Sequence, residues 1–365
     1  MKLGVSSFFQ DVSNFLRSGS VLGIDLGTVS VKMAEVSEKK GKFKLENYGI
    51  LETKNYLSQP NRVIQTSALK LVEKDIYEYL RILLSVIKPK TKNILVSVPS
   101  FAVFITTIDM PLLSREETGK AIMFQARQYI PLPVSLVSID WFKIEEFVNV
   151  QGERSQRILL IGVPNEIIRK YRNIFNELGL KLIALEVESL ALTRALSKKD
   201  DGVTMMIDLG AESTNIIITE NGVLKYNGQT DYGGIYLTQA LSRGLGVSVS
   251  RAEELKRRRG LTGTGGEMEL STLILPFLDV ILQEIRHTKD VYERRFLKKV
   301  EKVIVCGGGA KLLGIQEYFS SQLNLPFAAP ETLKEILHPI WLESAMNGLN
   351  ADLAIAVGLT KRYFV

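Results

Sequence analysis

The chain has 365 residues, 45% of them hydrophobic, and a formal net charge of +6. It is long enough for two lobes with large cores, and its modest charge singles out neither a nucleic acid nor a membrane as partner. Its one cysteine, Cys306, excludes an intrachain disulfide and favours a reducing compartment. No run approaches the roughly 18–20 apolar residues of a transmembrane helix, and residues 1–20 lack the apolar core of a secretory signal. We therefore expect a soluble, cytoplasmic protein.

Residues 1–20 are predicted to form a separate N-terminal segment. Phe8, Val12 and Phe15 recur there at helical spacing, and Gly19 follows as a stop signal. Such a stretch can bind a membrane or a partner, but its polar face is not notably basic, so packing on its own domain is the preferred interpretation.

Strand-like segments dominate residues 21–99. Apolar, β-branched runs at 21–26, 29–37, 43–54 and 92–100 predict strands, and an amphipathic run at 68–87 predicts a helix. We assign residues 21–99 and 179–200 to lobe one, a mixed sheet with helices on its faces.

Residues 100–178 are predicted to be a compact unit inserted into lobe one. Strand patterns at 101–111, 138–148 and 155–164 alternate with helical patterns at 114–130 and 165–179. Ser114 followed by Glu117 is a capping box that begins the first of these helices.

Residues 201–365 are assigned to lobe two, with a peripheral subdomain at about residues 235–299. Two strands flank a turn at Asn221-Gly222, helices follow, and a last strand leads into a glycine loop and a final helix at 351–359.

Two short stretches repeat one pattern, "GIDLGTVSVK" at 23–32 and "MIDLGAESTN" at 206–215. Glycine lets the backbone approach a phosphate closely, and Ser or Thr adds hydroxyl donors. Each copy has an aspartate at the strand end, and Mg²⁺ takes one or two carboxylates together with phosphate oxygens. We predict Asp25 and Asp208 as metal ligands, and as phosphate-binding residues Gly27, Thr28, Val29, Ser30, Lys32, Gly210, Glu212, Ser213 and Thr214.

A third motif, "IVCGGGAKL" at 304–312, places three glycines after a buried strand. A flat base can lie against such a backbone, and we predict cofactor contacts from Gly307, Gly308, Gly309 and Leu312. One Asp-x-Gly turn is common in ordinary hairpins. Two copies, each opening a lobe, together with this loop favour nucleotide binding, and the pattern is neither a Rossmann fingerprint nor a P-loop.

Together these motifs resemble the two phosphate motifs and the adenosine motif of the actin/DnaK/FtsA ATPase superfamily. The resemblance implies an α/β, ribonuclease H-like, duplicated two-lobed fold with an FtsA-like inserted subdomain, and ATP and Mg²⁺ as ligands. It implies that residues 187–196 and 351–359 are the connecting helices and that Glu253 and Lys256 contact the nucleoside. Glu188 matches the residue that positions water, although a plain buried carboxylate is the alternative.

Two positions depart from the superfamily pattern, Glu212 and Asn215 in the second phosphate motif. Binding tolerates such changes better than turnover does. The expectation is therefore ATP binding, with hydrolysis slow or conditional.

Residues 124–141, "FQARQYIPLPVSLVSIDW", together with "DLGAEST", more closely resemble the PilM family of type IV pilus assembly. This implies an actin-like scaffold at the inner face of the cytoplasmic membrane. Its inserted unit and lobe one would bind the cytoplasmic N-terminal tail of PilN, with other pilus proteins as further partners, no nucleic acid, and the membrane reached only through partners.

Two alternatives stay open. The first is an FtsA-like, filament-forming cell-division protein, which the absence of an amphipathic membrane helix after "VGLTKRYFV" disfavours. The second is a small-molecule kinase of the same superfold, for which no motif for a catalytic base is recognised.

Overall fold

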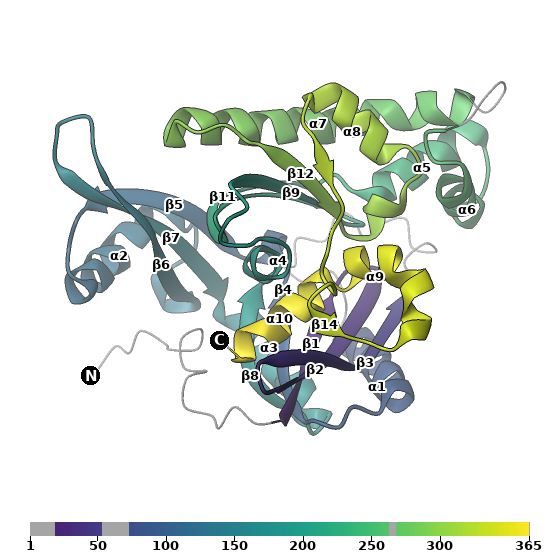
Figure 1. Cartoon of the computed structure of the whole chain (residues 1–365), viewed down its shortest axis with the longest axis horizontal. Coiled ribbons are helices and arrows are strands. Elements are labelled where there is room, and N and C mark those ends of the chain that lie inside the picture. Colours follow the sequence, from purple (N-terminus) through teal and green to yellow (C-terminus); the bar gives the residue numbers. More distant parts are fainter. Residues whose placement is uncertain (1–18, 53–72, 263–267, 365) are drawn as a thin grey trace.

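Two sheets of similar construction form the two lobes, and a third, smaller sheet lies beside them (Figure 1). The computed structural model describes residues 19–52, 73–262 and 268–364, so the predicted N-terminal amphipathic stretch lies outside the described residues. Within these ranges, no helix combines the length and the apolar content needed to cross a bilayer.

The first sheet has the strand order β14-β3-β2-β1-β4-β8. β1, β2 and β3 pair antiparallel, whereas β4 and β8 extend the sheet in parallel from β1. α1 and α3 cover one face and α4 and α10 the other. The elements are β1 (Gly19–Leu26), β2 (Ser30–Lys39), β3 (Lys42–Glu52), α1 (Glu73–Ile87), β4 (Asn93–Val98), α3 (Asn165–Glu177), β8 (Lys181–Val187), α4 (Glu188–Leu196), β14 (Ile336–Leu337) and α10 (Ala354–Phe364).

The second sheet repeats this plan with the order β11-β10-β9-β12-β13. β9 pairs antiparallel with β10 and parallel with β12, as β1 does with β2 and β4. The repeated sequence motif is therefore matched by a repeated hairpin. The elements are β9 (Val203–Leu209), β10 (Thr214–Glu220), β11 (Val223–Thr230), α5 (Gly234–Leu245), α6 (Val249–Arg259), α7 (Met268–Phe296), β12 (Lys302–Cys306), α8 (Ile315–Leu323) and β13 (Phe327–Ala328).

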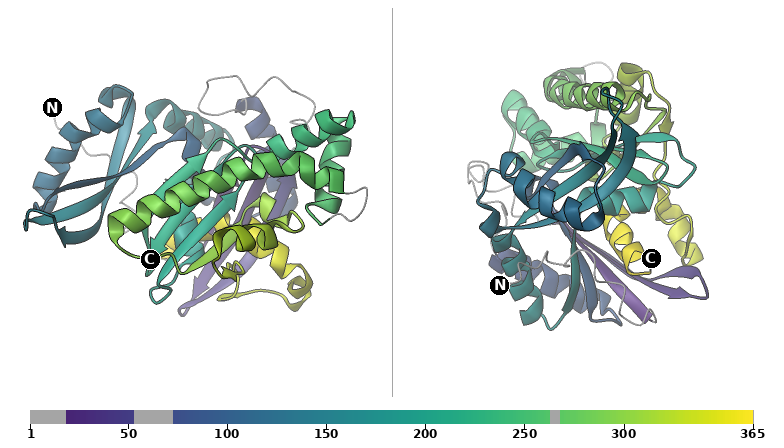
Figure 2. Two further views of the ribbon diagram at one scale, coloured as in Figure 1. Left: turned by 90° about the horizontal axis from the view of Figure 1, so that it is seen from above. Right: turned by 90° about the vertical axis from the view of Figure 1, so that its left-hand side faces the viewer.

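The inserted unit is a three-stranded antiparallel sheet of order β5-β7-β6 with one helix on it (Figure 2, right). Ser114 and Glu117 form the predicted capping box at the start of that helix. The unit is smaller than residues 100–178, because α3 packs against lobe one through Ile167, Tyr171 and Phe175. The elements are β5 (Phe104–Pro111), α2 (Arg115–Tyr129), β6 (Val137–Val148) and β7 (Arg154–Pro164).

The predicted boundary of lobe two also needs correction, because the chain returns to lobe one near its C-terminus. β14 pairs with β3 of the first sheet, and Leu333, Leu353 and Val357 share a core with Ala34 and Val36. α9 (Met346–Asp352) leads into α10, which packs on β1. β8 is a further difference, because this strand runs to Val187, the residue with which the resemblance begins the connecting helix at 187–196.

α10 lies in very close contact with its neighbours. A Cβ atom built on Gly358 would lie 2.0 Å from the carbonyl oxygen of Ala191 in α4, and one on Gly23 in β1 would lie 2.0 Å from that of Ala356. Only glycine allows backbones to approach so closely. This contact fixes the two connecting helices against each other and against the first sheet.

We expect Gly358→Ala to lower the free energy of unfolding by about 3 kcal/mol, because the added methyl group overlaps backbone that has no room to move. Gly119→Ala is the matched control: it also lies inside a helix, but its Cβ would meet only Trp141, 3.9 Å away. It should be neutral or stabilising by about 0.5–1 kcal/mol. Urea unfolding measures both, and equal effects would contradict the close contact.

Candidate functional site

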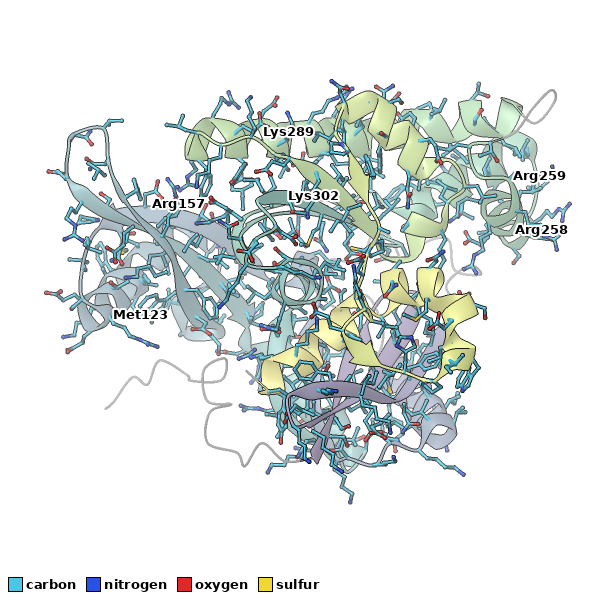
Figure 3. The ribbon with its side chains drawn as sticks, in the orientation of Figure 1. Met123, Arg157, Arg258, Arg259, Lys289 and Lys302 are labelled. Atoms are coloured by element: carbon cyan, nitrogen blue, oxygen red, sulfur yellow. The ribbon has the colours of Figure 1, made fainter. Side chains whose placement is uncertain are left out.

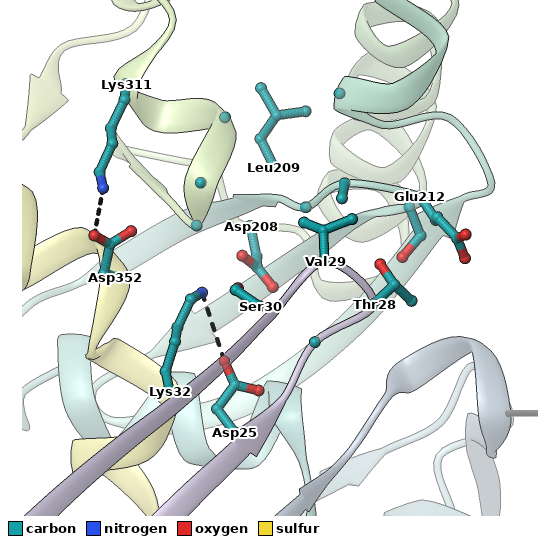
Figure 4. A pocket seen from close by; sticks show the side chains of 18 of the residues that line it. Asp25, Thr28, Val29, Ser30, Lys32, Asp208, Leu209, Glu212, Lys311 and Asp352 are labelled. Carbon is teal, nitrogen blue, oxygen red and sulfur yellow. Dashed lines mark hydrogen bonds and ion pairs between the residues drawn. The ribbon is translucent and has the colours of Figure 1, made fainter. Parts of the chain in front are cut away.

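A cavity of about 440 Å³ lies where the two lobes meet. The β1–β2 turn, the β9–β10 turn and the loop after β12 all open onto it, so residues far apart in sequence converge there (Figure 4). Thr214 does not line the cavity, since its buried hydroxyl donates to the carbonyl oxygen of Tyr232. The other predicted residues line it: Asp25, Gly27, Thr28, Val29, Ser30, Lys32, Glu188, Asp208, Gly210, Glu212, Ser213, Glu253, Lys256, Gly307, Gly308, Gly309 and Leu312.

Lys32 is the central cation of the cavity floor. Its ammonium group lies 3.6 Å from the carboxylate of Asp25, which stands opposite it in the β1–β2 pair. Burial would lower the pKa of Lys32, but the surrounding carboxylates, Asp25 first and Asp208 next, raise it overall. Ser97 of β4 donates a hydrogen bond to Asp25 and so fixes its orientation.

Three carboxyl groups share this floor with the one lysine. Burial raises the pKa of Asp208 to about 6. Burial, and then the charges of Asp25 and Asp208, raise the pKa of Glu188 well above its ordinary value. Asn215, opposite Asp208 in the β9–β10 pair, donates a hydrogen bond to Glu188 over 3.3 Å. The floor therefore carries more acidic groups than its lysine neutralises and suits an added cation.

The other end of the cavity is formed by α5 and α6. The ammonium group of Lys256 donates to the carbonyl oxygen of Gly234 and to the hydroxyl of Thr238, and it lies 2.7 Å from Glu253. Burial lowers the pKa of Lys256, although Glu253 opposes this. These polar groups are fixed in place beside the cavity, which suits recognition of a neutral polar ligand group.

The glycines at 307, 308 and 309 are each explained by a different structural constraint. Gly307 has a φ of 77°, and a Cβ on it would lie 2.3 Å from Asp208. A Cβ on Gly309 would lie 2.3 Å from Leu209. A Cβ on Gly308 would meet nothing within 4 Å among the described residues, so this glycine borders open space in the cavity. A short 3-10 turn at Gly308–Lys311 follows, and α8 begins at Ile315.

Sequence reasoning missed two ion pairs at the cavity. Lys311 pairs with Asp352, and Arg257 pairs with Glu52 across the two lobes over 2.9 Å. Neither pair has a local motif, because its members come from distant segments. Ser97 was also missed, although a hydroxyl inside the apolar strand "NILVSV" is a signal that was available.

The donors at the cavity decide which kind of metal site it can form. Among the described residues, no group of three or more His, Cys, Asp or Glu side chains gathers as a metal site. Two carboxylates at one cavity, with ligand oxygens completing the shell, are nevertheless the arrangement that Mg²⁺ prefers. The donor set therefore fits Mg²⁺ bound together with a phosphate ligand rather than a metal held by protein alone.

Comparison with known proteins identifies the family. The family model of the type IV pilus assembly protein PilM matches residues 23–364. The chain belongs to the PilM family. The resemblance noted in the sequence is thereby confirmed, and the family match covers both lobes and the inserted unit.

Solved structures and curated relatives support the fold of this PilM-family chain. A PilM–PilN type IV pilus biogenesis complex superimposes with a TM-score of 0.80 at 20% identity, covering 96% of this chain and 99% of that chain. MreB5 of Spiroplasma citri bound to ADP superimposes with a TM-score of 0.51 at 12% identity, covering 95% of this chain and 97% of that one. The cell division protein FtsA of Enterococcus faecalis is 23% identical over 353 residues, 85% of this chain and 79% of FtsA. The predicted actin-like fold class is confirmed.

The raised pKa of Asp208 predicts a stability effect in the absence of Mg²⁺ and nucleotide. A carboxyl group with a folded-state pKa of about 6, against about 3.9 when unfolded, costs stability increasingly as the pH rises from about 4 to about 6. Asp208→Asn should therefore raise the free energy of unfolding at about pH 7.5 by up to about 3 kcal/mol, and by little near pH 4.

Urea unfolding at the two pH values measures this effect. Asp231→Asn, at an exposed position, is the control and should change nothing. An Asp208→Asn variant no more stable than the native chain at the higher pH would contradict the burial cost.

Proposed function

We propose that the chain is an ATP-binding, actin-like scaffold of the type IV pilus assembly machinery that binds the cytoplasmic tail of PilN. The observation that carries the nucleotide half is the convergence of two equivalent hairpin turns and one glycine loop on a single interlobe cavity. MreB5 from Spiroplasma citri, which has a related fold, is bound to ADP in its crystal structure, and this supports the nucleotide half of the proposal.

Each part of the cavity has a role in this proposal. Backbone N–H groups and hydroxyls of the two turns, at residues 27–30 and 210–213, bind the phosphates, with Lys32 as their cation. Asp25 and Asp208 would hold Mg²⁺, which would neutralise phosphate charge. Glu253 and Lys256 recognise the nucleoside, and Gly308 leaves room for it.

Hydrolysis depends on the state of Glu188. This residue is buried, accepts a hydrogen bond from the backbone N–H of Ser100 over 3.1 Å, and has a raised pKa. A raised pKa disfavours the ionised carboxylate that general-base catalysis needs, and a bound cation would lower this pKa again. This supports binding with slow or conditional turnover.

Gly308→Val should abolish most nucleotide binding, weakening the affinity for a fluorescent ATP analogue by about a hundredfold or more, because its side chain fills space that the nucleoside occupies. The fold should be unaffected, since the new Cβ meets no atom of the described residues within 4 Å. Gly348→Val is the matched control: its Cβ would meet only Lys311 at 3.9 Å, and it does not line the cavity. Normal ATP binding by a folded Gly308→Val variant would refute the assigned pocket.

The partner half rests on family membership and on the solved PilM–PilN complex of the same fold. The resemblance to the PilM family implies a tail between the inserted unit and lobe one. The groove at the root of the inserted unit lies instead between that unit and β11 of lobe two. A cavity of about 240 Å³ there is lined by residues 103–106, by Tyr129, Ile130 and Leu160 of the inserted unit, and by Asn227 and Gln229 of β11.

Two open strand edges face this groove. β5 is the last strand of the inserted sheet and β11 the last strand of the second sheet. The two strands contact each other, but among the described elements neither has a hydrogen-bonded strand on its outer edge. An extended peptide can bind to such edges through its backbone, while apolar side chains enter pockets. The groove therefore suits an extended tail with a few apolar anchors.

A synthetic PilN tail should bind the purified chain in calorimetry with moderate affinity, because an unstructured peptide loses entropy on binding. Tyr129→Ala should weaken binding by about tenfold. Phe124→Ala is the control: this residue is 70% exposed on the same helix but does not line the groove. An equal loss of affinity in both variants would indicate that the tail binds the outer face of α2. Absence of binding by the native chain would refute PilN as the partner.

A further inference from the structure

The inserted unit is attached to the molecule at two places. Its root is covalent: the chain leaves lobe one before β5 and re-enters it after β7, at α3. Its other attachment is to lobe two, where β5 and β6 contact β11 and where the C-terminal end of α7 approaches (Figures 1 and 2). The unit thus spans both lobes beside the hinge.

Arg157 of β7 lies at the centre of the second attachment (Figure 3). Its buried guanidinium group makes two bonds to Asp109, of 2.7 and 3.0 Å, and a third to Glu145. It also lies between two aromatic rings, 4.6 Å from the centroid of Phe147 and 4.3 Å from that of Phe296 in α7. Such a planar, fully engaged arginine holds the ends of the inserted strands together.

Each of the two carboxylates also binds a cation of lobe two. Arg295 of α7 lies 2.9 Å from Asp109, and Lys225 of β11 lies 2.8 Å from Glu145. We call these five residues, Arg157, Asp109, Glu145, Arg295 and Lys225, the charged junction. Lys225 is only 7% exposed, and separating it from Glu145 would leave it only the longer contact with Glu220, at 3.6 Å, so the separation costs free energy. The junction therefore resists separation of the inserted unit from lobe two.

The charged junction adjoins the groove at the root of the unit. Arg295 also donates to the hydroxyl and the carbonyl oxygen of Thr107, which follows the groove residue Thr106 in β5. Lys225 lies two positions before the groove residue Asn227 in β11. Each of the two strands that wall the groove thus carries a member of the junction, Asp109 in β5 and Lys225 in β11.

The geometry points to a strut: we propose that the inserted unit couples the angle between the lobes to the width of the groove, through the charged junction. A ligand held by both lobes at the interlobe cavity biases the angle between them. Because the inserted unit is fixed to lobe one by its chain and to lobe two by ion pairs, a change in this angle must change its position. This coupling rests on the proposed function, because it is the means by which nucleotide regulates binding of the tail.

The test compares the affinity of the full-length chain for the PilN tail with and without Mg–ATP, and hydrogen exchange of β5 and β11 in the same two states. In the native chain, Mg–ATP should change the tail affinity by about fivefold or more and alter exchange in both strands. In Arg295→Gln and in Lys225→Gln, affinities for ATP alone and for the tail alone should persist, but the change should fall within about twofold.

Lys299→Gln is the matched control, because it removes a cation of the same region whose ion pair, with Glu293 of α7, lies inside lobe two and involves no member of the junction. It should behave as the native chain does. A native-sized nucleotide effect in both junction variants, or no nucleotide effect on exchange in the native chain, would overturn the strut. A third outcome separates the two proposals. If the native chain does not bind the tail, but Mg–ATP alters hydrogen exchange in β5 and β11 of the native chain and not in the junction variants, the partner is refuted and the strut is supported.

Discussion

The contact on which the arrangement depends most is that between the backbones of α10, α4 and β1. Three segments that are distant in the chain meet there without side chains between them, at Gly23 and Gly358. α4 and α10 also pack on the inner face of the second sheet, in a core that includes Met206, Ile217 and Ile304. This pair of helices therefore lies between the two sheets and sets their relative position at the base of the cavity.

Interactions between charged groups determine the properties of the cavity floor, whereas backbone packing determines how the surrounding helices and strands are arranged. Lys32, Asp25, Asp208 and Glu188 come from two sheets and a connecting helix, and their mutual effects keep the lysine charged and raise the pKa of Asp208 and Glu188. Such a site stores unfavourable energy that a bound cation relieves. The floor of the cavity is therefore a compromise between stability and ligand binding, as is common where ionisable groups are buried together.

Much of the fold was accessible from the sequence because its signals are local. The paired turns, the glycine loop and the capping box at Ser114 each follow from a short pattern with a physical reason. The sequence does not reveal that α3 and α10 pack on lobe one, because this depends on which apolar surface each helix buries in the folded molecule. Here these surfaces are the cores around Tyr171 and Val357. In the candidate site, the glycines and aspartates were predictable, whereas Glu52 with Arg257 and Lys311 with Asp352 form only after the lobes assemble.

The return of the chain to lobe one has a consequence for the order in which the molecule is built. During synthesis, β1 to β3 emerge early, yet the helix that covers Gly23 and Ala34 is encoded far downstream, at Ala354–Phe364. Lobe two has all its strands and helices by residue 328 and can fold before its predecessor. Part of one apolar face of the nascent first sheet, over β1 and β2, therefore stays uncovered until translation reaches α10, and such exposed apolar surface is what chaperones recognise.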